Sequence, residues 1–238
     1  MKHTLLSLVA MASLLAPVSA SAEEEVGREV IFGMGAKFEL IKDAAFDYFS
    51  EDDWLTSGLL SVEVEAASDL FVGLGLGFAT REAWLWDKYQ TTLSYTEPQI
   101  LVRKAFAVSD WMRPYASLAG TYAWTTTTVA LWGNTEITRE DGWGEGRFGG
   151  RAAAGLELSV PRSAFRDGDT ATGFFKDMSM GVTFEAGYGI KQPVDLSDLP
   201  VSGSSAGEGL DAMPQASPDL GELWLQGFYM AFDFRFYL

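Results

Sequence analysis

The sequence predicts an all-β fold, namely an eight-stranded antiparallel up-and-down transmembrane β-barrel. Three observations lead to this fold. Apolar and polar side chains alternate in several segments, as they do in a strand whose two faces meet different surroundings. The apolar face is made of bulky Phe, Leu and Met, whereas the other face is rich in Gly, Ala and Ser, as a narrow lumen requires. Short turns and long polar loops alternate between the segments, which is typical of a membrane barrel.

The N-terminus has the pattern of a secretory signal peptide. A basic start, MKHT, is followed by an apolar run at 5–16 and by the small residues Ala20 and Ala22 before three glutamates. We expect cleavage after Ala22, with Ala20 as the alternative, so that residues 1–22 are the signal peptide and residues 23–238 form one outer-membrane β-barrel domain. No later segment supplies about 18 uninterrupted apolar residues, so we expect no helix to span a membrane.

The first three predicted strands are 30–40, 59–66 and 70–81. In each of them the even-numbered positions are apolar, for example Val30, Phe32 and Met34 in the first. The odd-numbered positions hold glycine, serine and charged residues, among them Glu63 and Arg81. Since successive side chains of a strand point to opposite faces, each segment has one apolar face and one polar face.

Five further strands complete the barrel, at 92–106, 113–125, 151–160, 178–191 and 228–238. The segment at 92–106 contains Pro98. In the segment at 113–125 the two faces differ little in polarity. The last segment, FYMAFDFRFYL, alternates most regularly. Its apolar face consists of Phe228, Met230, Phe232, Phe234, Phe236 and Leu238.

The predicted connections alternate in length. Short turns are expected near 67–69 and 108–111, and long polar loops near 42–57, 81–91, 126–147 and 192–221. An even number of strands places both ends of the barrel at the rim that carries the short turns. Segment 161–177 breaks the alternation, because a short turn is expected there, and it carries either a small insertion or further structure.

Tryptophan placement indicates which rim is which, because indole favours a membrane interface. Only Trp111 lies at the short-turn rim. The others lie in the long loops or at the strand ends beside them, and these are Trp54, Trp84, Trp86, Trp124, Trp132, Trp143 and Trp224.

The polar faces carry charged side chains that a membrane barrel would enclose. Because an isolated buried charge is very costly, we expect these side chains to pair and to close the lumen as an ionic network. Removing Arg151 is expected to cost about 3 to 5 kcal/mol by leaving acids unpaired. The network consists of Glu29, Lys37, Glu39, Glu63, Glu65, Arg81, Glu97, Arg103, Arg151, Glu157, Glu185, Lys191, Asp233 and Arg235.

The composition argues against several kinds of chemistry. The chain has no cysteine, and its one histidine, His3, lies in the signal peptide. The mature chain therefore lacks the groups for Ser-His and Cys-His catalysis and for the usual zinc and haem sites. We expect no enzyme activity, no cofactor and no metal centre. A net charge of -16 disfavours binding to nucleic acid.

Two patterns admit a second interpretation. The glycines at 73, 75 and 77 have the spacing G-x-G-x-G within a strand and not that of a dinucleotide-binding turn, so we attribute them to clearance in the lumen. The acidic stretch SEDDW at 50–54 is interpreted as a solvated loop tip. Binding of a divalent cation there is the alternative, because hard cations prefer carboxylate oxygens.

The alternative fold is a soluble antiparallel barrel or sandwich whose apolar face points inward. Three features weigh against it. The apolar side chains have too much volume for the interior of an eight-stranded barrel, and lysine is sparse on the supposed outer face. In addition, the last residue, Leu238, is apolar and ends a strand, where a soluble protein usually has a polar, frayed tail.

Three stretches carry a family resemblance. RPYASLAGTYAW at 113–124 resembles the Arg-Pro-Tyr strand of small outer-membrane barrels, and GGRAAAGLELSV at 149–160 is similar to the strand that follows it. The terminal strand, with Phe232, Phe234, Phe236 and Leu238, resembles the signal read by the outer-membrane insertion machinery. The chain thus resembles the OmpA-like and OmpW-like barrel superfamily. The resemblance implies a monomer in the bacterial outer membrane, with outer-membrane lipid and the insertion machinery as partners.

Two functions follow from these observations. The first is a structural or surface-interaction role, with a lumen closed by the ionic network and acidic loops facing outward. The alternative is a narrow channel or lateral-gate transporter for small apolar solutes, which the OmpW-like resemblance implies and to which Tyr115 and Tyr122 point. A barrel enzyme acting on lipid or peptide is disfavoured, because the mature chain has no histidine.

Overall fold

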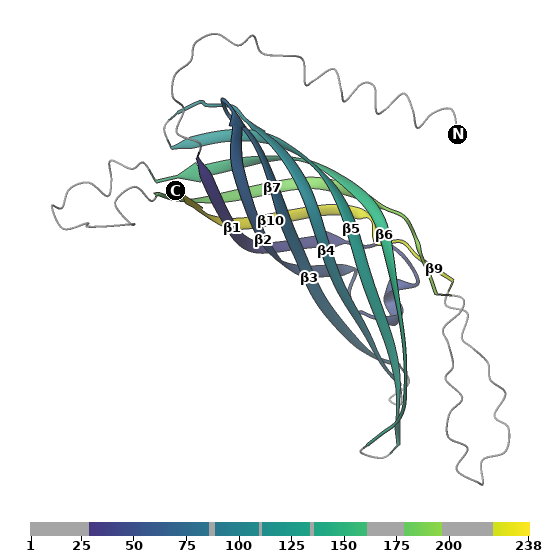
Figure 1. Cartoon of the computed structure of the whole chain (residues 1–238). Helices are drawn as coiled ribbons and strands as arrows, with labels where there is room; N and C mark the ends of the chain where they lie inside the picture. The colour runs from purple at the N-terminus through teal and green to yellow at the C-terminus, as the bar shows by residue number, and fades with distance from the viewer. Residues whose placement is uncertain (1–28, 86–88, 110, 134–135, 161–178, 197–220) are drawn as a thin grey trace, which may run out of the picture.

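Eight strands close into an antiparallel barrel in the computed structural model, which describes residues 29–85, 89–109, 111–133, 136–160, 179–196 and 221–238 (Figure 1). The strands of the barrel are β1 (Val30–Leu40), β2 (Trp54–Ala67), β3 (Leu70–Leu85), β4 (Tyr89–Ala105), β5 (Met112–Gly133), β6 (Glu136–Ser159), β7 (Ser179–Lys191) and β10 (Gly227–Tyr237). Their order around the barrel is β1-β10-β7-β6-β5-β4-β3-β2. The predicted fold class is confirmed in strand number, strand direction and closure.

The first and last strands close the barrel. β1 and β10 pair in antiparallel register, with Phe32 opposite Phe236, and the backbones of Val30 and Leu238 exchange hydrogen bonds beyond the strand ends. Both ends of the barrel therefore lie at one rim, beside the turn at 68–69 and the connection between β4 and β5. We call this rim the turn end and the opposite rim the loop end.

The two faces of the strands point as the alternation predicts. Even-numbered apolar side chains face outward and are exposed, with Leu74 at 65% and Ile100 at 62%. Odd-numbered side chains face the lumen, where Lys37, Glu63 and Arg103 are each only 1% exposed. The soluble alternative, which places the apolar face inside, is therefore wrong. An apolar exterior on a closed barrel is suited to contact with hydrocarbon.

Several strands are longer than the sequence pattern indicated, and β5 and β6 are lengthened most. The predicted loops at 81–91 and 126–147 are wrong in large part, because β3 runs to Leu85, β4 starts at Tyr89, and β5 and β6 extend to Gly133 and from Glu136. β5 has 22 residues and β6 has 24, whereas about 9 to 11 span a bilayer. One wall of the barrel, β3 to β6, thus rises beyond the other at the loop end (Figure 1).

The two remaining loop-end connections contain short elements. A 3-10 turn, η2 (Phe46–Tyr48), lies between β1 and β2. Two short strands, β8 (Val194–Asp195) and β9 (Glu222–Leu223), pair with each other between β7 and β10. The predicted signal peptide at 1–22, segment 161–177 and most of the predicted loop at 192–221 lie outside the described residues.

Helices play little part in the described residues. Among these residues, none of the helical segments has the length and apolar character needed to cross a membrane.

The outward face of β10 allows a test of lipid contact by depth. Phe232 lies in the middle of β10 and Phe236 one residue from its end. We expect Phe232→Arg to cost about 2 to 4 kcal/mol of folding free energy in lipid vesicles, and Phe236→Arg about 0 to 1, since arginine is costliest at the bilayer midplane. Urea unfolding in vesicles measures both values. A cost at Phe236 equal to or above that at Phe232 would show that this face does not meet lipid.

Candidate functional site

The lumen holds a closed ring of four charges near the loop end, which we call the loop-end cluster. It consists of Lys37, Glu39, Glu97 and Lys191, from β1, β4 and β7. Each ammonium contacts both carboxylates: Lys37 Nζ lies 3.0 Å from Glu39 and 3.1 Å from Glu97, and Lys191 Nζ lies 2.9 Å and 3.3 Å from the same two groups. The Tyr95 hydroxyl also donates to Glu97. Because every charge has two partners of opposite sign, the cluster offsets the cost of taking these groups out of water.

A second group of charges, the turn-end cluster, lies nearer the other rim and consists of Glu63, Arg103, Glu157 and Arg235. Arg103 bridges two acids, with Nε 2.7 Å from Glu63 and Nη1 2.7 Å from Glu157. Arg235 Nη1 lies 2.8 Å from the other oxygen of Glu63. These side chains are at most 5% exposed, so solvent and salt screen the pairs little.

Aromatic rings enclose both clusters. The guanidinium of Arg103 lies 4.3 Å from the ring centre of Phe71 and 5.3 Å from that of Tyr115. The ammonium groups of Lys37 and Lys191 lie 5.7 Å and 5.5 Å from the ring of Tyr95. Cations at such distances are attracted by the ring face, and the rings also fill space that water would otherwise occupy.

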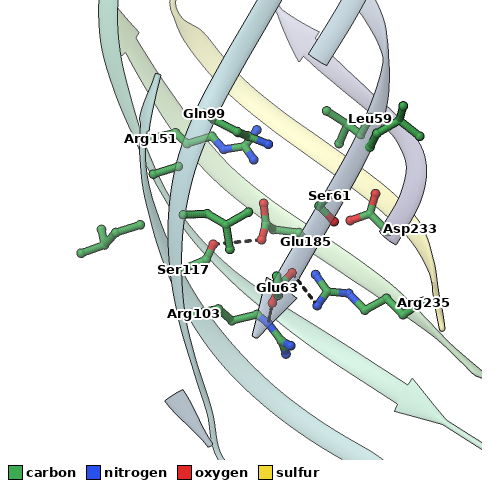
Figure 2. A pocket seen from close by; sticks show the side chains of 14 residues that line it. Leu59, Ser61, Glu63, Gln99, Arg103, Ser117, Arg151, Glu185, Asp233 and Arg235 are labelled. Carbon is green, nitrogen blue, oxygen red and sulfur yellow. Dashed lines mark hydrogen bonds and ion pairs between the residues drawn. The ribbon is translucent and has the colours of Figure 1, made fainter. Parts of the chain in front are cut away.

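A third, looser layer lies between the clusters and contains Arg151, Glu185 and Asp233 (Figure 2). Glu185 accepts hydrogen bonds from the hydroxyls of Ser117 at 2.9 Å and Tyr229 at 2.8 Å. Arg151 lies 5.5 Å from the Tyr229 ring and makes no ion pair within 4.0 Å with the described residues. The ion pairs expected of Arg151 are therefore not found among the described residues, whereas Arg103 bridges two acids.

An apolar group closes the loop end above the charges, and we call it the apolar cap. Its side chains come from the two loop-end connections and are at most 6% exposed. They pack against Leu55 of β2 and against Leu93, Tyr95 and Ala123, which line the inner face of the long wall. The cap consists of Ile41, Ala45, Phe46, Phe49, Val194, Leu196, Leu223 and Leu225.

Hydrogen bonds hold the cap in place. Asp43 is central, because one carboxylate oxygen accepts from the Ala45 amide at 2.9 Å and the other from the Trp224 amide at 3.3 Å, which ties the two connections together. The Thr91 hydroxyl donates to the Tyr48 carbonyl and so ties η2 to β4. The predicted loop at 42–57 is thus polar at its tip, at Glu51, Asp52 and Asp53, but folds its aromatic residues inward.

Three predicted members of the network lie apart from the two clusters. Glu29 lies at the turn end, 3.9 Å from Arg113. Glu65 accepts a hydrogen bond from the Asp69 amide at 3.0 Å and so supports the turn. Arg81 lies toward the loop end, where it donates to the Trp54 carbonyl and the Thr56 hydroxyl. The remaining predicted members are enclosed in the lumen.

The sequence pattern did not identify several interior residues. Arg113, on the polar face of β5, lies 3.7 Å from Glu157 and extends the turn-end cluster toward the rim. Tyr95, Tyr115, Tyr229 and Tyr237 are buried, each at most 3% exposed, and none of them was among the predicted members of the lumen network. The cap could have been suspected from Phe46 and Phe49, because these aromatic residues interrupt an otherwise acidic segment.

Two of the three glycines of β3 have the expected role, whereas a Cβ atom at Gly77 would make only ordinary contacts. A Cβ atom at Gly75 would collide with the side chain of Gln99, and one at Gly73 would collide with Glu63. Glycine is therefore required here so that the side chains of neighbouring strands can cross the lumen.

Tryptophan side chains lie on the outer surface where the structure describes them. Trp84, Trp124 and Trp224 are exposed at the loop-end half of the barrel, and Trp111 is exposed at the turn end. Trp86 and the side chains of Trp132 and Trp143 lie outside the described residues.

Comparisons with known proteins give likenesses to solved structures only. No family model matches the chain, and no curated protein matches it. The chain is similar to the N-terminal β-barrel domain of Pseudomonas aeruginosa OprF, at 12% identity and a TM-score of 0.39, over 88% of this chain and 96% of that one. It is also similar to Ail, the attachment invasion locus protein of Yersinia pestis, at 11% identity and a TM-score of 0.40, over 87% and 97%. Neisserial surface protein A matches at 8% identity and a TM-score of 0.36, over 89% and 95%. We base the fold on the strand pairing and not on these likenesses.

The pairing geometry predicts different costs for two arginines. Arg103→Ala leaves two buried carboxylates without their shared partner and should cost about 3 to 5 kcal/mol of unfolding free energy. Arg151→Ala removes a cation–π contact and should cost less, about 1 to 2 kcal/mol. Urea unfolding measures both costs, with Glu51→Ala on the exposed loop tip as a control that should change stability by no more than about 0.5 kcal/mol. A cost for Arg151→Ala equal to that for Arg103→Ala would contradict this assignment.

Proposed function

We propose that this protein is a small bacterial outer-membrane β-barrel with a structural or surface-interaction role and a lumen that does not conduct. The observation that carries the proposal is the filling of the lumen. Two ionic clusters, in which each charge lies within 4.0 Å of an opposite charge, block it at two levels. The apolar cap then covers the loop end.

The outer-membrane location is supported by the exterior of the barrel and by its last strand. The outward side chains of β1, β2 and β3 are large and apolar, and many are more than 40% exposed. Such a surface is unfavourable in water and is the expected one for a strand in a bilayer. β10 carries the aromatic pattern that resembles the insertion signal.

A role at the cell surface is supported by the loop end. Its long wall extends beyond the length that a bilayer covers. Acidic side chains are exposed there, so a basic or polar partner would be attracted to this end in preference to an anionic one. They include Asp47, Glu51, Asp52, Asp53, Glu82, Asp195 and Glu222.

The transporter alternative has less support. Its solute would need either a path along the lumen, which the clusters and cap fill, or an opening in the wall. The wall at β1, β2 and β3 pairs in continuous register through Gly33, Ser61 and Gly75, so the hydrogen-bonded strands leave no gap there.

Single-channel recording in planar bilayers tests the closed lumen. We expect no steady conductance from the refolded protein, because the clusters leave no water-filled path. The variant Phe46→Ala, which opens only the cap, should stay silent because both ionic clusters remain below it. An open porin serves as the positive control for the bilayer. Steady openings of the unmodified protein would overturn the proposal in favour of the transporter.

A further inference from the structure

The outer face of the long wall changes character above the apolar part of the barrel (Figure 1). On β3 the outward side chains are apolar from Leu70 to Phe78, which is about the length of strand that spans a bilayer. Beyond that level the outward positions of β3, β4 and β5 are mostly Thr and Ser. This part of the face therefore stands clear of the hydrocarbon and meets the surroundings of the cell.

The hydroxyl groups on this face lie side by side across three strands. Thr80 of β3 is opposite Ser94 of β4, which in turn is opposite Thr126 of β5. A second row lies farther from the membrane, where Thr92 is opposite Thr128. Because neighbouring strands are about 4.8 Å apart, the hydroxyl groups repeat at short and regular intervals. We call this array the hydroxyl ladder, and it consists of Thr80, Thr92, Ser94, Thr96, Thr126 and Thr128.

An exposed indole borders the ladder on a flat part of the sheet. Trp124 is opposite Thr96 and is 49% exposed. A Cβ atom at Gly144, which is opposite Thr126 on β6, would lie 3.5 Å from the Thr126 hydroxyl and 3.6 Å from the indole Cζ2. The indole and the hydroxyl thus meet over a residue without a side chain, so that a flat ligand can reach both. Within the part of the chain that the structure describes, the ladder hydroxyls make no hydrogen bond.

The ladder is nearly uncharged, although the protein is strongly acidic. Glu82 is the one charged side chain among the described outward positions of β3, β4 and β5 at this level, and it accepts a hydrogen bond from Gln90 at 3.3 Å. Exposed protein surfaces usually mix charges of both signs. The face offers no cation to an anionic sugar chain, and the net charge of -16 repels one. A neutral ligand rich in hydroxyl groups is the one that this face suits.

We propose that the hydroxyl ladder and Trp124 form a docking surface for an uncharged, flat sugar chain of the cellulose type outside the cell. The hydroxyl groups of such a chain donate and accept hydrogen bonds, as those of Ser and Thr do. The apolar face of a sugar ring packs on the apolar face of the indole. This proposal rests on the surface-interaction role proposed above and names its partner.

Titration calorimetry with cellohexaose tests the docking surface on the full chain, refolded into phospholipid nanodiscs. We expect saturable binding. The double variant Ser94→Ala with Thr126→Val removes two hydroxyl groups from the ladder and should weaken binding about tenfold, as the loss of two hydrogen bonds implies. The control Ser68→Ala removes an exposed hydroxyl group at the turn end and should bind as the unmodified protein does. Urea midpoints show whether the barrel of each variant is intact.

Four outcomes would overturn the proposal. The first is no binding of cellohexaose, or equal binding by the intact double variant; this outcome leaves the closed lumen standing, because conductance tests that separately. The second is tighter binding of heparin, which would show a site for anionic sugars. The third is loss of cellohexaose binding when lipopolysaccharide is added to the nanodiscs, since the membrane's own lipid would then cover the face. The last is a dimer in detergent that Thr126→Arg dissociates, which would assign the face to a second copy of the chain.

Discussion

Pairing of charges inside the barrel is the constraint on which the rest of this structure depends. The partners are far apart in the chain, since Lys191 and Glu39 are 152 residues apart and Arg103 and Glu157 are 54 apart. They meet only when the strands close in one register. A slip of one residue would turn the charged face toward the apolar surroundings and the Phe, Leu and Met face inward. The charge pairs in the lumen therefore stabilise this strand register and destabilise registers that are shifted by one residue.

The unequal wall heights explain how the loop end is closed. β1, β7 and β10 have 11 to 13 residues, whereas β5 and β6 have 22 and 24. The long wall therefore extends past the loop-end cluster on one side of the barrel only. The inner face of that wall carries Leu93 and Tyr95, which would be exposed to water without a cover. The connections from the short strands fold over and bury Phe46, Phe49 and their neighbours against it. The lumen is thus closed by charges at two levels and by apolar packing at a third.

Sequence alternation predicted the strands, their faces and most of the enclosed charges, because a period of two is directly visible along each strand. It did not predict how far the strands extend. The segment Thr125–Thr128 is polar like a loop, yet its β-branched residues favour a strand, and only the tertiary structure shows that this part of the wall continues. Sequence alternation also did not distinguish Arg151, which makes no ion pair with the described residues, from Arg103, which bridges two acids. Both are arginines on a polar face, and their partners depend on registers between strands that one sequence does not reveal.

The most direct test of the ionic lumen is a double-mutant cycle on Arg103 and Glu157, with Arg103→Met and Glu157→Gln measured singly and together. The pair is 2.7 Å apart and both side chains are at most 2% exposed. Unfolding in lipid vesicles should give a coupling free energy of about 1 to 3 kcal/mol. Because the pair is shielded from solvent, raising the salt concentration should change that coupling little. A coupling near zero, or one that salt abolishes, would show that the lumen is wet and open and would contradict this account.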